Sequence, residues 1–486
     1  MIVRPLALGT LLRRTVVRPR SVAALLACHT SELAFRLIVQ AIFPDEATAI
    51  WQAGQPGASR ETARVEAFLR RVEAQFCPLY EAEEYDQVAW GIPFIRLGWR
   101  YEDFHALDRR LGGGHGEESQ GEFEAELTAG SVRPVPPATA TRVWIAPANF
   151  AGQGRAWAAA LETQLPHTGA RNMAVAGRIP FSADQLVSPP VFRDLAWQRA
   201  QERYVLGNYT HVLVESERPV FGTLYGRTCE EDVRRLRRAG LGVALISHGS
   251  DLRVPSEHAR RHPHSPLADA ADATTAVLER QARRNRELLA RYDGHVFVST
   301  PDLLDDAPHA TWCPTVVDAA EWASDTAVLA RGVPRVVHIP SNGRLKGTAF
   351  VDAALEPLAR AGAIDYRRLE GVDRERLRRE YLEADLVVDQ VAMGLYGVAA
   401  IEAMAAGRVV LAYVGESVRE RIRQVTGMEV PIVEVTPETL RERVEALLAD
   451  REGARAAAGE GPGYAREVHD GRLSARVLGD WLGASA

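Results

Sequence analysis

The chain has 486 residues, of which 46% are hydrophobic and 25% charged, and its formal net charge is −6 at pH 7. These values are typical of a soluble globular protein of about three domains. Arginines and acids are interspersed along the chain without a long basic stripe, which argues against a nucleic acid as partner.

The cysteines give no sign of a disulfide framework or a structural zinc site. There are four, and none shares a CxxC spacing with another: Cys28, Cys77, Cys229 and Cys313. Four cysteines are too few to crosslink a chain of this size, so the simplest location is the reducing cytoplasm. No metal site is predicted.

Residues 1–105 are expected to form a mostly helical accessory region, because residues 22–42 and 61–76 have apolar positions at helical spacing. Its first segment is basic, with five arginines before the first acid, Glu32. The apolar runs there are interrupted by polar residues, so no transmembrane segment is expected. The arginines are compatible with a weak peripheral membrane contact, although a frayed terminus is the simpler interpretation.

Residues 106–141 are predicted to be a flexible linker. They are rich in Gly, Pro and Glu, contain few apolar residues and show no periodicity. This segment divides the accessory region from the main body of the chain.

The main body begins with a predicted strand at residues 142–147, a loop, and a helix at 155–165. The loop contains Asn149, Gly152 and Gly154, and a Gly-x-Gly after a strand suggests a dinucleotide site. However, Trp157 holds the third glycine position, and no acid ends a strand about twenty residues later, and both features argue against NAD binding. The loop is either a ligand-contacting turn or an ordinary tight connection.

Strands and helices then alternate, which predicts a doubly wound parallel sheet in a domain covering residues 142–318. Further strands are expected at 210–214, 220–224, 242–246 and 295–299, and helices at 194–204, 230–238 and 274–292. His248 follows one strand in a polar turn, where it is either a ligand contact or a satisfied strand-end histidine. Three later histidines are interpreted as part of a surface loop: His258, His262 and His264.

The second domain, residues 319–486, contains Lys346, the only lysine among 58 Lys and Arg residues. It lies in a turn-rich loop between a strand near 336–337 and a helix at 348–358, a place that suits an anion such as a phosphate. The loop is not a Walker A motif, because Lys346 is flanked by Leu345 and Gly347. The alternative is an ordinary solvated lysine.

A second glycine-rich turn begins at Gly394 and precedes a small-residue helix near 398–406. With the apolar strands at 386–389 and 409–413 it predicts a β-α-β crossover, with further strands at 364–369 and 432–435. Glu402 is an acid on an otherwise apolar helix. It is either a carboxylate that binds hydroxyl groups or the single polar residue of a solvent-facing stripe.

These two segments together resemble a known family. The combination of Lys346-Gly-Thr with Tyr396-Gly-x4-Glu402-Ala-Met-Ala-x-Gly resembles the donor-binding half of GT-B glycosyltransferases of the retaining group 1 type. The resemblance covers residues 335–415 well and 142–334 more loosely. It implies two Rossmann-like doubly wound domains that face a cleft, with a C-terminal helix crossing back to the first domain.

The resemblance also implies an activity and residue roles. The substrates would be a nucleoside-diphosphate sugar and an acceptor, with retention of configuration and with neither cofactor nor metal. Lys346 and Arg344 would hold the diphosphate and Glu402 the ribose hydroxyls, while His248 would meet the donor sugar. The other expected substrate-binding residues are Asn149, Gly152, Gly154, Asn342, Gln390, Tyr396 and Gly397.

One position departs from the family pattern. The family usually has a second glutamate eight residues before the first, and here that place holds Gly394. This leaves a different donor, a substitute from Asp389 or Gln390, or a catalytically degenerate protein that binds a nucleotide or partner without transfer. A sugar-nucleotide epimerase is a further alternative.

Overall fold

The computed structural model describes residues 129–130, 132–177, 181–226 and 228–483. The predicted accessory region and most of the predicted linker lie outside these ranges. The described chain forms two compact units. The smaller comprises the described residues up to Pro136 with Met173–Tyr209 and Arg218–Leu241, and the larger comprises Pro137–Asn172, Thr210–Glu217 and Gly242 onward.

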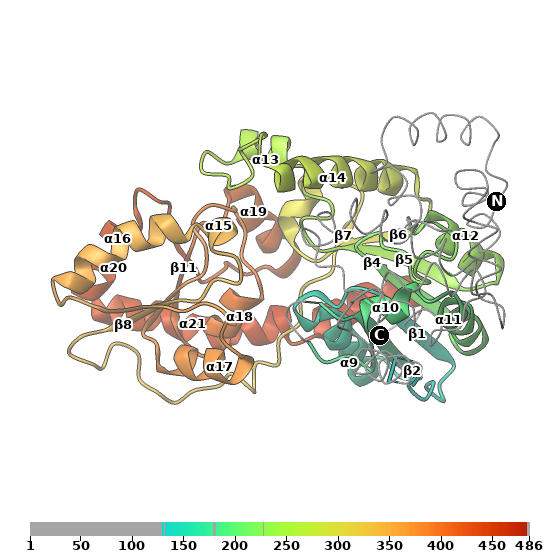
Figure 1. Ribbon diagram of the computed structural model, residues 1–486. Coiled ribbons are helices and arrows are strands. Elements are labelled where there is room, and N and C mark those ends of the chain that lie inside the picture. The colour runs from blue at the N-terminus through green and yellow to red at the C-terminus, as the bar shows by residue number, and fades with distance from the viewer. Residues whose placement is uncertain (1–128, 131, 178–180, 227, 484–486) are drawn as a thin grey trace, which may run out of the picture. The chain divides into compact units, whose positions relative to one another are not determined.

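Two parallel β-sheets organise the fold (Figure 1). The first has the strand order β3-β2-β1-β4-β5-β6-β7. Its strands are β1 (Thr141–Ala146), β2 (Thr168–Val175), β3 (Gln185–Val187), β4 (His211–Glu215), β5 (Gly242–Ser247), β6 (His295–Val298) and β7 (Thr311–Trp312). The predicted doubly wound arrangement is confirmed, and β2, β3 and β7 add to the predicted strands.

The second sheet has the order β12-β11-β10-β8-β9 and lies in the larger unit. Its strands are β8 (Arg335–His338), β9 (Asp365–Arg368), β10 (Leu386–Val388), β11 (Val409–Ala412) and β12 (Val433–Glu434). Within each sheet, every pair of neighbouring strands among the described residues is parallel. The carboxyl ends of the strands in each sheet therefore lie along one edge, where open α/β sheets bind ligands.

In the described part of the larger unit, six helices accompany the second sheet. They are α15 (Gly343–Lys346), α16 (Thr348–Arg360), α17 (Arg374–Glu383), α18 (Val398–Ala405), α19 (Glu416–Thr426) and α20 (Leu440–Ala449). Apolar side chains of α16 and α20 form one core cluster with strand residues such as Val336, Leu386 and Leu411. The predicted β-α-β crossover is confirmed as β10, α18 and β11, with β10 and β11 paired in parallel.

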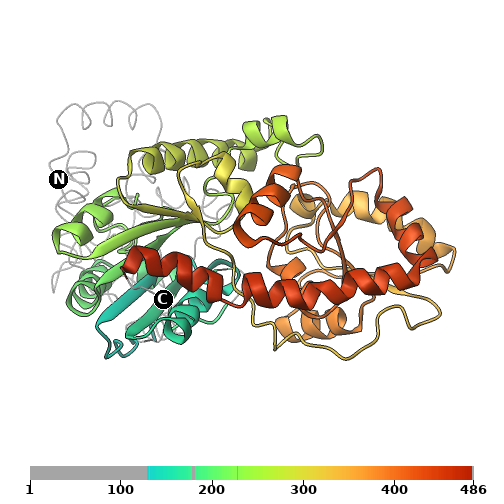
Figure 2. The ribbon, with the colours of Figure 1, turned by 180° about the vertical axis from the view of Figure 1, so that it is seen from behind.

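Two consecutive helices end the described chain, α21 (Arg451–His469) and α22 (Arg472–Leu482). Figure 2 shows them in red, running one after the other across the front of the view. Helix α21 packs on α18, and α22 packs on α9 (Gln153–Gln164), where Leu478 and Trp481 join the core of the first sheet. Both sheets are thus held by the same terminal segment.

In the larger unit the first sheet is accompanied by α9, η1 (Phe150–Gly152), α13 (Pro255–Arg261), α14 (Ala273–Arg291) and η2 (Pro301–Asp305). The smaller unit contains β3 and the helices α10 (Pro189–Arg193), α11 (Leu195–Asn208) and α12 (Glu230–Arg238). Among the described residues no helix is long and apolar enough to cross a membrane.

The predicted strand at residues 220–224 is wrong, because this segment forms turns. The backbone N–H groups of Val220 and Phe221 donate to the Asp232 carboxylate, at 2.6 and 3.1 Å, instead of to a neighbouring strand. Apolar residues alone therefore gave a misleading strand signal, and a buried side chain took the place of a strand partner.

Candidate functional site

Lys346 lies beyond the carboxyl end of β8, in a segment that contains a short helix where only turns were expected. Asn342 caps α15 through Oδ1, which accepts a hydrogen bond from the Leu345 N–H at 3.2 Å. Lys346 is the last residue of this helix, and Gly347 joins it to α16. Gly347 has a φ of +74°, and a Cβ there would lie 2.7 Å from Val391 Cγ2, so only glycine fits.

The lysine is part of an ion pair. Its Nζ lies 2.5 Å from Oδ1 of Asp389, the residue that follows β10. The Asp389 side chain is 1% exposed and that of Lys346 21%, and Asp389 Oδ2 is enclosed without a hydrogen-bond partner. The solvated-lysine interpretation is therefore wrong, since the ammonium is held at the edge of the sheet.

Arg344, predicted to share the diphosphate with Lys346, is engaged elsewhere. Its guanidinium donates to the Pro266 carbonyl at 3.2 Å and lies 3.5 Å from Asp272 Oδ2. The side chain is 45% exposed. Contact with a diphosphate beside Lys346 would require Arg344 to leave these partners.

Glu402 lies on α18, which begins after Gly397. It is 4% exposed, which excludes the solvent-stripe interpretation. Burial raises the pKa of Glu402 to about 7, against the opposing effect of Arg374, whose Nη1 is 3.3 Å from Oε1. The negative charge of Asp389 also contributes to raising it, so both carboxylates act at the same edge of the sheet.

We expect Glu402→Gln to raise the free energy of unfolding, relative to the wild type, by more at pH 8 than at pH 5. Because the folded-state pKa is raised, the native state binds more protons than the unfolded chain between the ordinary pKa and about 7. The stability from this residue is present at low pH and is lost as the pH rises through about 7, by roughly 2 to 3 kcal/mol between pH 5 and 8. Glutamine removes that loss.

Urea unfolding at both pH values measures this difference. The matched control is Glu442→Gln on the exposed side of α20, for which no such pH-dependent gain is expected. A Glu402→Gln effect that is the same at pH 5 and pH 8 would mean that Glu402 ionises like an exposed carboxyl group.

Two predicted substrate-binding residues hold the turn between β10 and α18. Gln390 Nε2 donates to the carbonyls of Leu395 and Tyr413, and Oε1 accepts from two backbone N–H groups. All the hydrogen bonds that its amide can make are therefore used. The Tyr396 hydroxyl is buried against Tyr464 Oη at 2.7 Å and His469 Nε2 at 3.0 Å.

The turn that these residues hold leaves no room for a side chain at Gly394. Its φ is +72°, and a Cβ there would lie 2.3 Å from Cε1 of His262. His262 is fixed in turn by Tyr413, whose hydroxyl is 3.1 Å from Nδ1. The absence of the expected glutamate is thus built into the backbone of the turn.

A second group of predicted residues surrounds Glu215, at the end of β4. This carboxylate is fully buried and accepts hydrogen bonds from the backbone N–H groups of Ala148 and Asn149, at 3.0 Å. Asn149 Oδ1 accepts from the Arg155 N–H at 3.0 Å, and Gly152 caps α9. A Cβ at Gly154 would lie 3.1 Å from Glu215 Oε1, so glycine gives the carboxylate its space.

His248, just after β5, completes this group. Its Nε2 lies 3.3 Å from Glu215 Oε1, within ion-pair distance but not aligned for a hydrogen bond. The ring stacks on Trp157, with centroids 5.4 Å apart, and meets the edge of Phe150. The sequence prediction missed Glu215, although an acid that ends an apolar strand was a visible signal.

The interpretation of the later histidines as a surface loop is wrong for His258. Pro255 starts α13, and His258 is buried on it, 2.7 Å from Ser265 Oγ and 3.1 Å from the Met393 carbonyl oxygen. Burial lowers the pKa of His258 to about 3, with a smaller contribution from the charge of Arg253.

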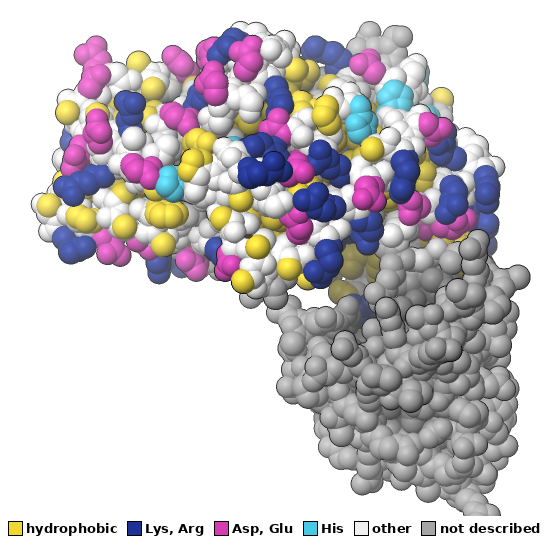
Figure 3. Space-filling model, turned by 90° about the horizontal axis from the view of Figure 1, so that it is seen from above, with side chains coloured by type: hydrophobic (Ala, Val, Ile, Leu, Met, Phe, Trp, Pro, Cys, Tyr) yellow, Lys and Arg dark blue, Asp and Glu magenta, His cyan; other side chains and the backbone are white. Residues whose placement is uncertain are grey.

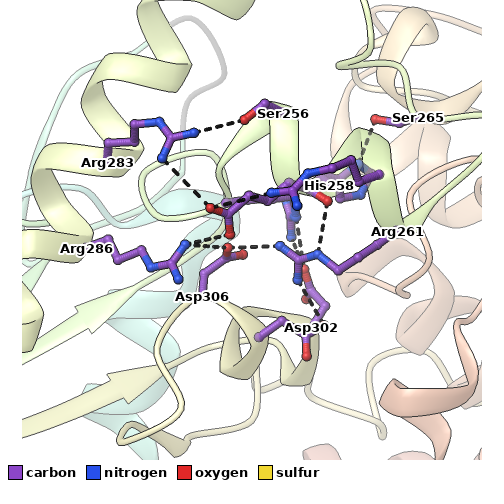
Figure 4. Close-up of polar contacts among 12 residues, drawn as sticks. Ser256, His258, Arg261, Ser265, Arg283, Arg286, Asp302 and Asp306 are labelled. Carbon is purple, nitrogen blue, oxygen red and sulfur yellow. Dashed lines mark hydrogen bonds and ion pairs between the residues drawn. The ribbon is translucent and has the colours of Figure 1, made fainter.

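Ion pairs surround this histidine, and Figure 4 shows Arg261 and Arg286 pointing toward Asp306. Acidic and basic side chains are likewise interspersed on the face in Figure 3, with no continuous basic surface among the residues described there. Within the described ranges, no three His, Cys, Asp or Glu side chains are arranged to hold a metal ion.

No protein-family model and no curated protein matches the sequence. Among solved structures, the chain is similar to sucrose-phosphate synthase from Thermosynechococcus elongatus, with 16% identity over 71% of this chain and 98% of that one, and a TM-score of 0.49. It is also similar to the glycosyltransferase WaaG, with 14% identity over 70% of this chain and 100% of that one, and a TM-score of 0.44. The similarity to Anabaena HepE in complex with UDP and glucose has 12% identity over 71% of this chain and 100% of that one, with a TM-score of 0.46. At such low TM-scores, function has to be argued from the chain's own residues.

Proposed function

We propose that this chain transfers a sugar from a nucleoside-diphosphate sugar to an acceptor. The observation that carries the proposal is the placement of Lys346. The chain's only lysine is held at 2.5 Å by the buried Asp389, at the carboxyl edge of a parallel sheet that also carries the buried Glu402. This combination provides a fixed positive charge and a hydroxyl acceptor on neighbouring segments.

The positive charge suits a leaving diphosphate. Negative charge grows on the diphosphate as the glycosidic bond breaks, and an ammonium held in place beforehand stabilises it without reorganisation. The N-terminus of α16 follows directly after Lys346 and Gly347, and its dipole adds to the positive potential. Asp389 keeps the ammonium from swinging into solvent before the ligand arrives.

Glu402 suits the ribose of the nucleotide. An ionised carboxylate accepts two hydrogen bonds from a pair of neighbouring hydroxyl groups. Because burial raises the pKa of Glu402 to about 7, ribose binding competes with protonation, and we expect nucleotide affinity to increase between pH 6 and 8. Retention of configuration and independence from metals are part of the proposal and rest on the motif around Tyr396 and Glu402.

A second candidate function is nucleotide binding without transfer. It is favoured by Gly394, where the positive φ and the His262 ring exclude the glutamate expected from the family pattern. The two functions differ in one measurable product: a glycosyltransferase releases nucleoside diphosphate in proportion to glycosylated acceptor, whereas a binding protein releases none. An epimerase would instead change the sugar while leaving it attached to the nucleotide.

Nucleotide binding is tested first by calorimetric titration with UDP, GDP, ADP and TDP. We expect one of them to bind, and to bind more weakly by about 1.5 to 3 kcal/mol when the charge at position 346 is removed together with its partner, in Lys346→Ala/Asp389→Asn. Incubation with matching sugar nucleotides and candidate acceptors then tests transfer, and NMR of the anomeric proton tests retention.

Because Lys346 is the only lysine, it also allows a direct protection experiment. An amine-specific acylating reagent has one side-chain target in this protein, and peptide mass spectrometry separates that product from the acylated α-amino group. We expect the nucleotide that binds to slow acylation of Lys346 and leave the α-amino group unaffected. Equal acylation rates with and without bound nucleotide would place the phosphates elsewhere.

A further inference from the structure

The buried carboxylate of Glu215 contacts both the loop after β1 and the histidine after β5. We propose that Glu215 is a positioning residue that fixes the tautomer of His248, so that Nδ1 accepts a hydrogen bond from a substrate hydroxyl. The inference rests on the proposed transfer reaction for the identity of the substrate. The tautomer itself can be tested without any substrate.

Glu215 is held in one orientation. Its side chain is 0% exposed, and its two oxygens accept hydrogen bonds from the N–H groups of Ala148 and Asn149. Among the described residues it has no Arg or Lys partner within ion-pair distance, and His248 is the ionisable group that it faces. A carboxylate fixed in this way presents a constant acceptor to the imidazole.

The ring of His248 is also fixed. It stacks on the buried Trp157 at an interplanar angle of 28° and meets Phe150 edge-on at 86°. The side chain is 9% exposed. Of its two nitrogens, Nε2 is enclosed and lacks a hydrogen-bond partner, whereas Nδ1 is not among the enclosed atoms.

The pair therefore has a preferred proton arrangement. Both Glu215 oxygens accept from backbone N–H groups, so the oxygen that faces Nε2 is a hydrogen-bond acceptor. The hydrogen of the imidazole then lies on Nε2 and the lone pair on Nδ1. Nδ1 can then accept from a hydroxyl group of the donor sugar or of the acceptor. At 3.3 Å from Glu215 Oε1, a lone pair on Nε2 would be repelled by the carboxylate oxygen, so the hydrogen is preferred on Nε2 without any movement of the fixed ring.

Backbone strain is concentrated at the same place. Six non-glycine residues in the described part of the chain have positive φ, and four of them follow β1 or β4, which are neighbours in the sheet. They are Asn149, Ala151, Ser216 and Glu217. Such conformations cost free energy and persist where the surrounding structure imposes them, often at binding sites.

The tautomer is tested by ¹⁵N NMR of the protein labelled at histidine nitrogens, with His248 assigned by its loss in His248→Asn. We expect the Nε2–H form in the wild type and a mixture with the Nδ1–H form in Glu215→Gln, because an amide can donate as well as accept. The control is Glu217→Gln, which changes a second buried carboxylate whose partners are Ser247 and Asn285. It should leave the His248 signals unchanged.

Enzyme kinetics then show whether the hydroxyl group that donates to His248 Nδ1 belongs to the donor sugar or to the acceptor. We expect kcat/KM for transfer to fall by about 100-fold or more in His248→Asn and in Glu215→Gln. If hydrolysis of the sugar nucleotide without acceptor falls equally, the hydroxyl belongs to the donor; if only transfer falls, it belongs to the acceptor.

An Nδ1–H tautomer in the wild type would overturn the proposal even if Glu215→Gln did not fold. A mixture of tautomers that appears equally in Glu217→Gln would also overturn it. If the wild type shows no transfer with any sugar nucleotide but has the expected tautomer, the proposed function fails, and the positioning by Glu215 stands without a substrate.

Discussion

Lys346→Ala is expected to lower the stability of the protein by about 3 kcal/mol, in addition to abolishing transfer. Lys346 Nζ is the counter-charge of Asp389, whose side chain is 1% exposed and whose Oδ2 has no other partner. Removal of the ammonium leaves a buried carboxylate without compensation, which costs more than the ion pair itself contributes. The alanine variant alone would therefore confuse loss of fold with loss of function.

Asp389→Asn in the same chain is expected to restore most of that stability, because a neutral amide no longer needs a counter-charge. Urea unfolding of the two single variants and the double variant gives the coupling energy directly. Arg344→Ala is the matched control on the same helix, since its guanidinium is 45% exposed and its ion pair with Asp272 should contribute less than about 1 kcal/mol.

The functional loss should behave differently from the loss of stability. The double variant folds but lacks the ammonium that would meet the diphosphate, so nucleotide binding should stay weak and transfer should stay absent. Wild-type turnover in the folded double variant would show that Lys346 is a structural partner of Asp389 and takes no part in the reaction.

Gly394→Glu is expected to destabilise the protein and to leave turnover no higher than in the wild type. The residue has a φ of +72°, a conformation that costs other residues about 1 to 2 kcal/mol. A Cβ would also lie 2.3 Å from His262 Cε1, so the ring has to move, and overpacking of this kind typically costs about 1 to 3 kcal/mol more. Thermal unfolding and the rate of nucleoside-diphosphate release measure both effects.

Two further variants separate the steric clash with His262 from the cost of the backbone conformation at position 394. Gly394→Ala carries the same Cβ without the carboxylate and should lose nearly as much stability. Combination with His262→Ala should recover the steric part and leave the cost of the backbone conformation. Increased transfer by a stable Gly394→Glu protein would contradict the conclusion that this turn is built for glycine, and would make the wild type a weakened enzyme.

The order of strands and helices was largely predictable from the sequence. Apolar runs such as residues 242–246 and 409–413, separated by helical patterns, predicted most of the parallel strands. Short strands with polar residues escaped, as β3 (Gln185–Val187) and β7 (Thr311–Trp312) did. Residues 220–224 have a strand-like composition but bind Asp232 through their backbone.

The candidate site was predictable as a set of segments but not as a set of contacts. Glycine-rich turns after strands identified the segments that contain Asn149, Lys346 and Glu402. The same signals could not show that the Gln390 amide is fully occupied within its turn, or that Arg344 is held by Pro266 and Asp272. A residue's type predicts what it can bind, while its neighbours determine whether it is free to do so.

The sequence by itself determined two parallel sheets, the single lysine, and the strand-turn-helix connections that place it at a sheet edge. Only the tertiary structure decided that Lys346 pairs with Asp389, 43 residues away, and that Glu215 meets Asn149, 66 residues away. Local pattern dictates where strands end, because apolar periodicity and glycine act over a few residues. Which strand ends become neighbours depends on the order of strands in the sheet, and that order is set by packing of the whole chain.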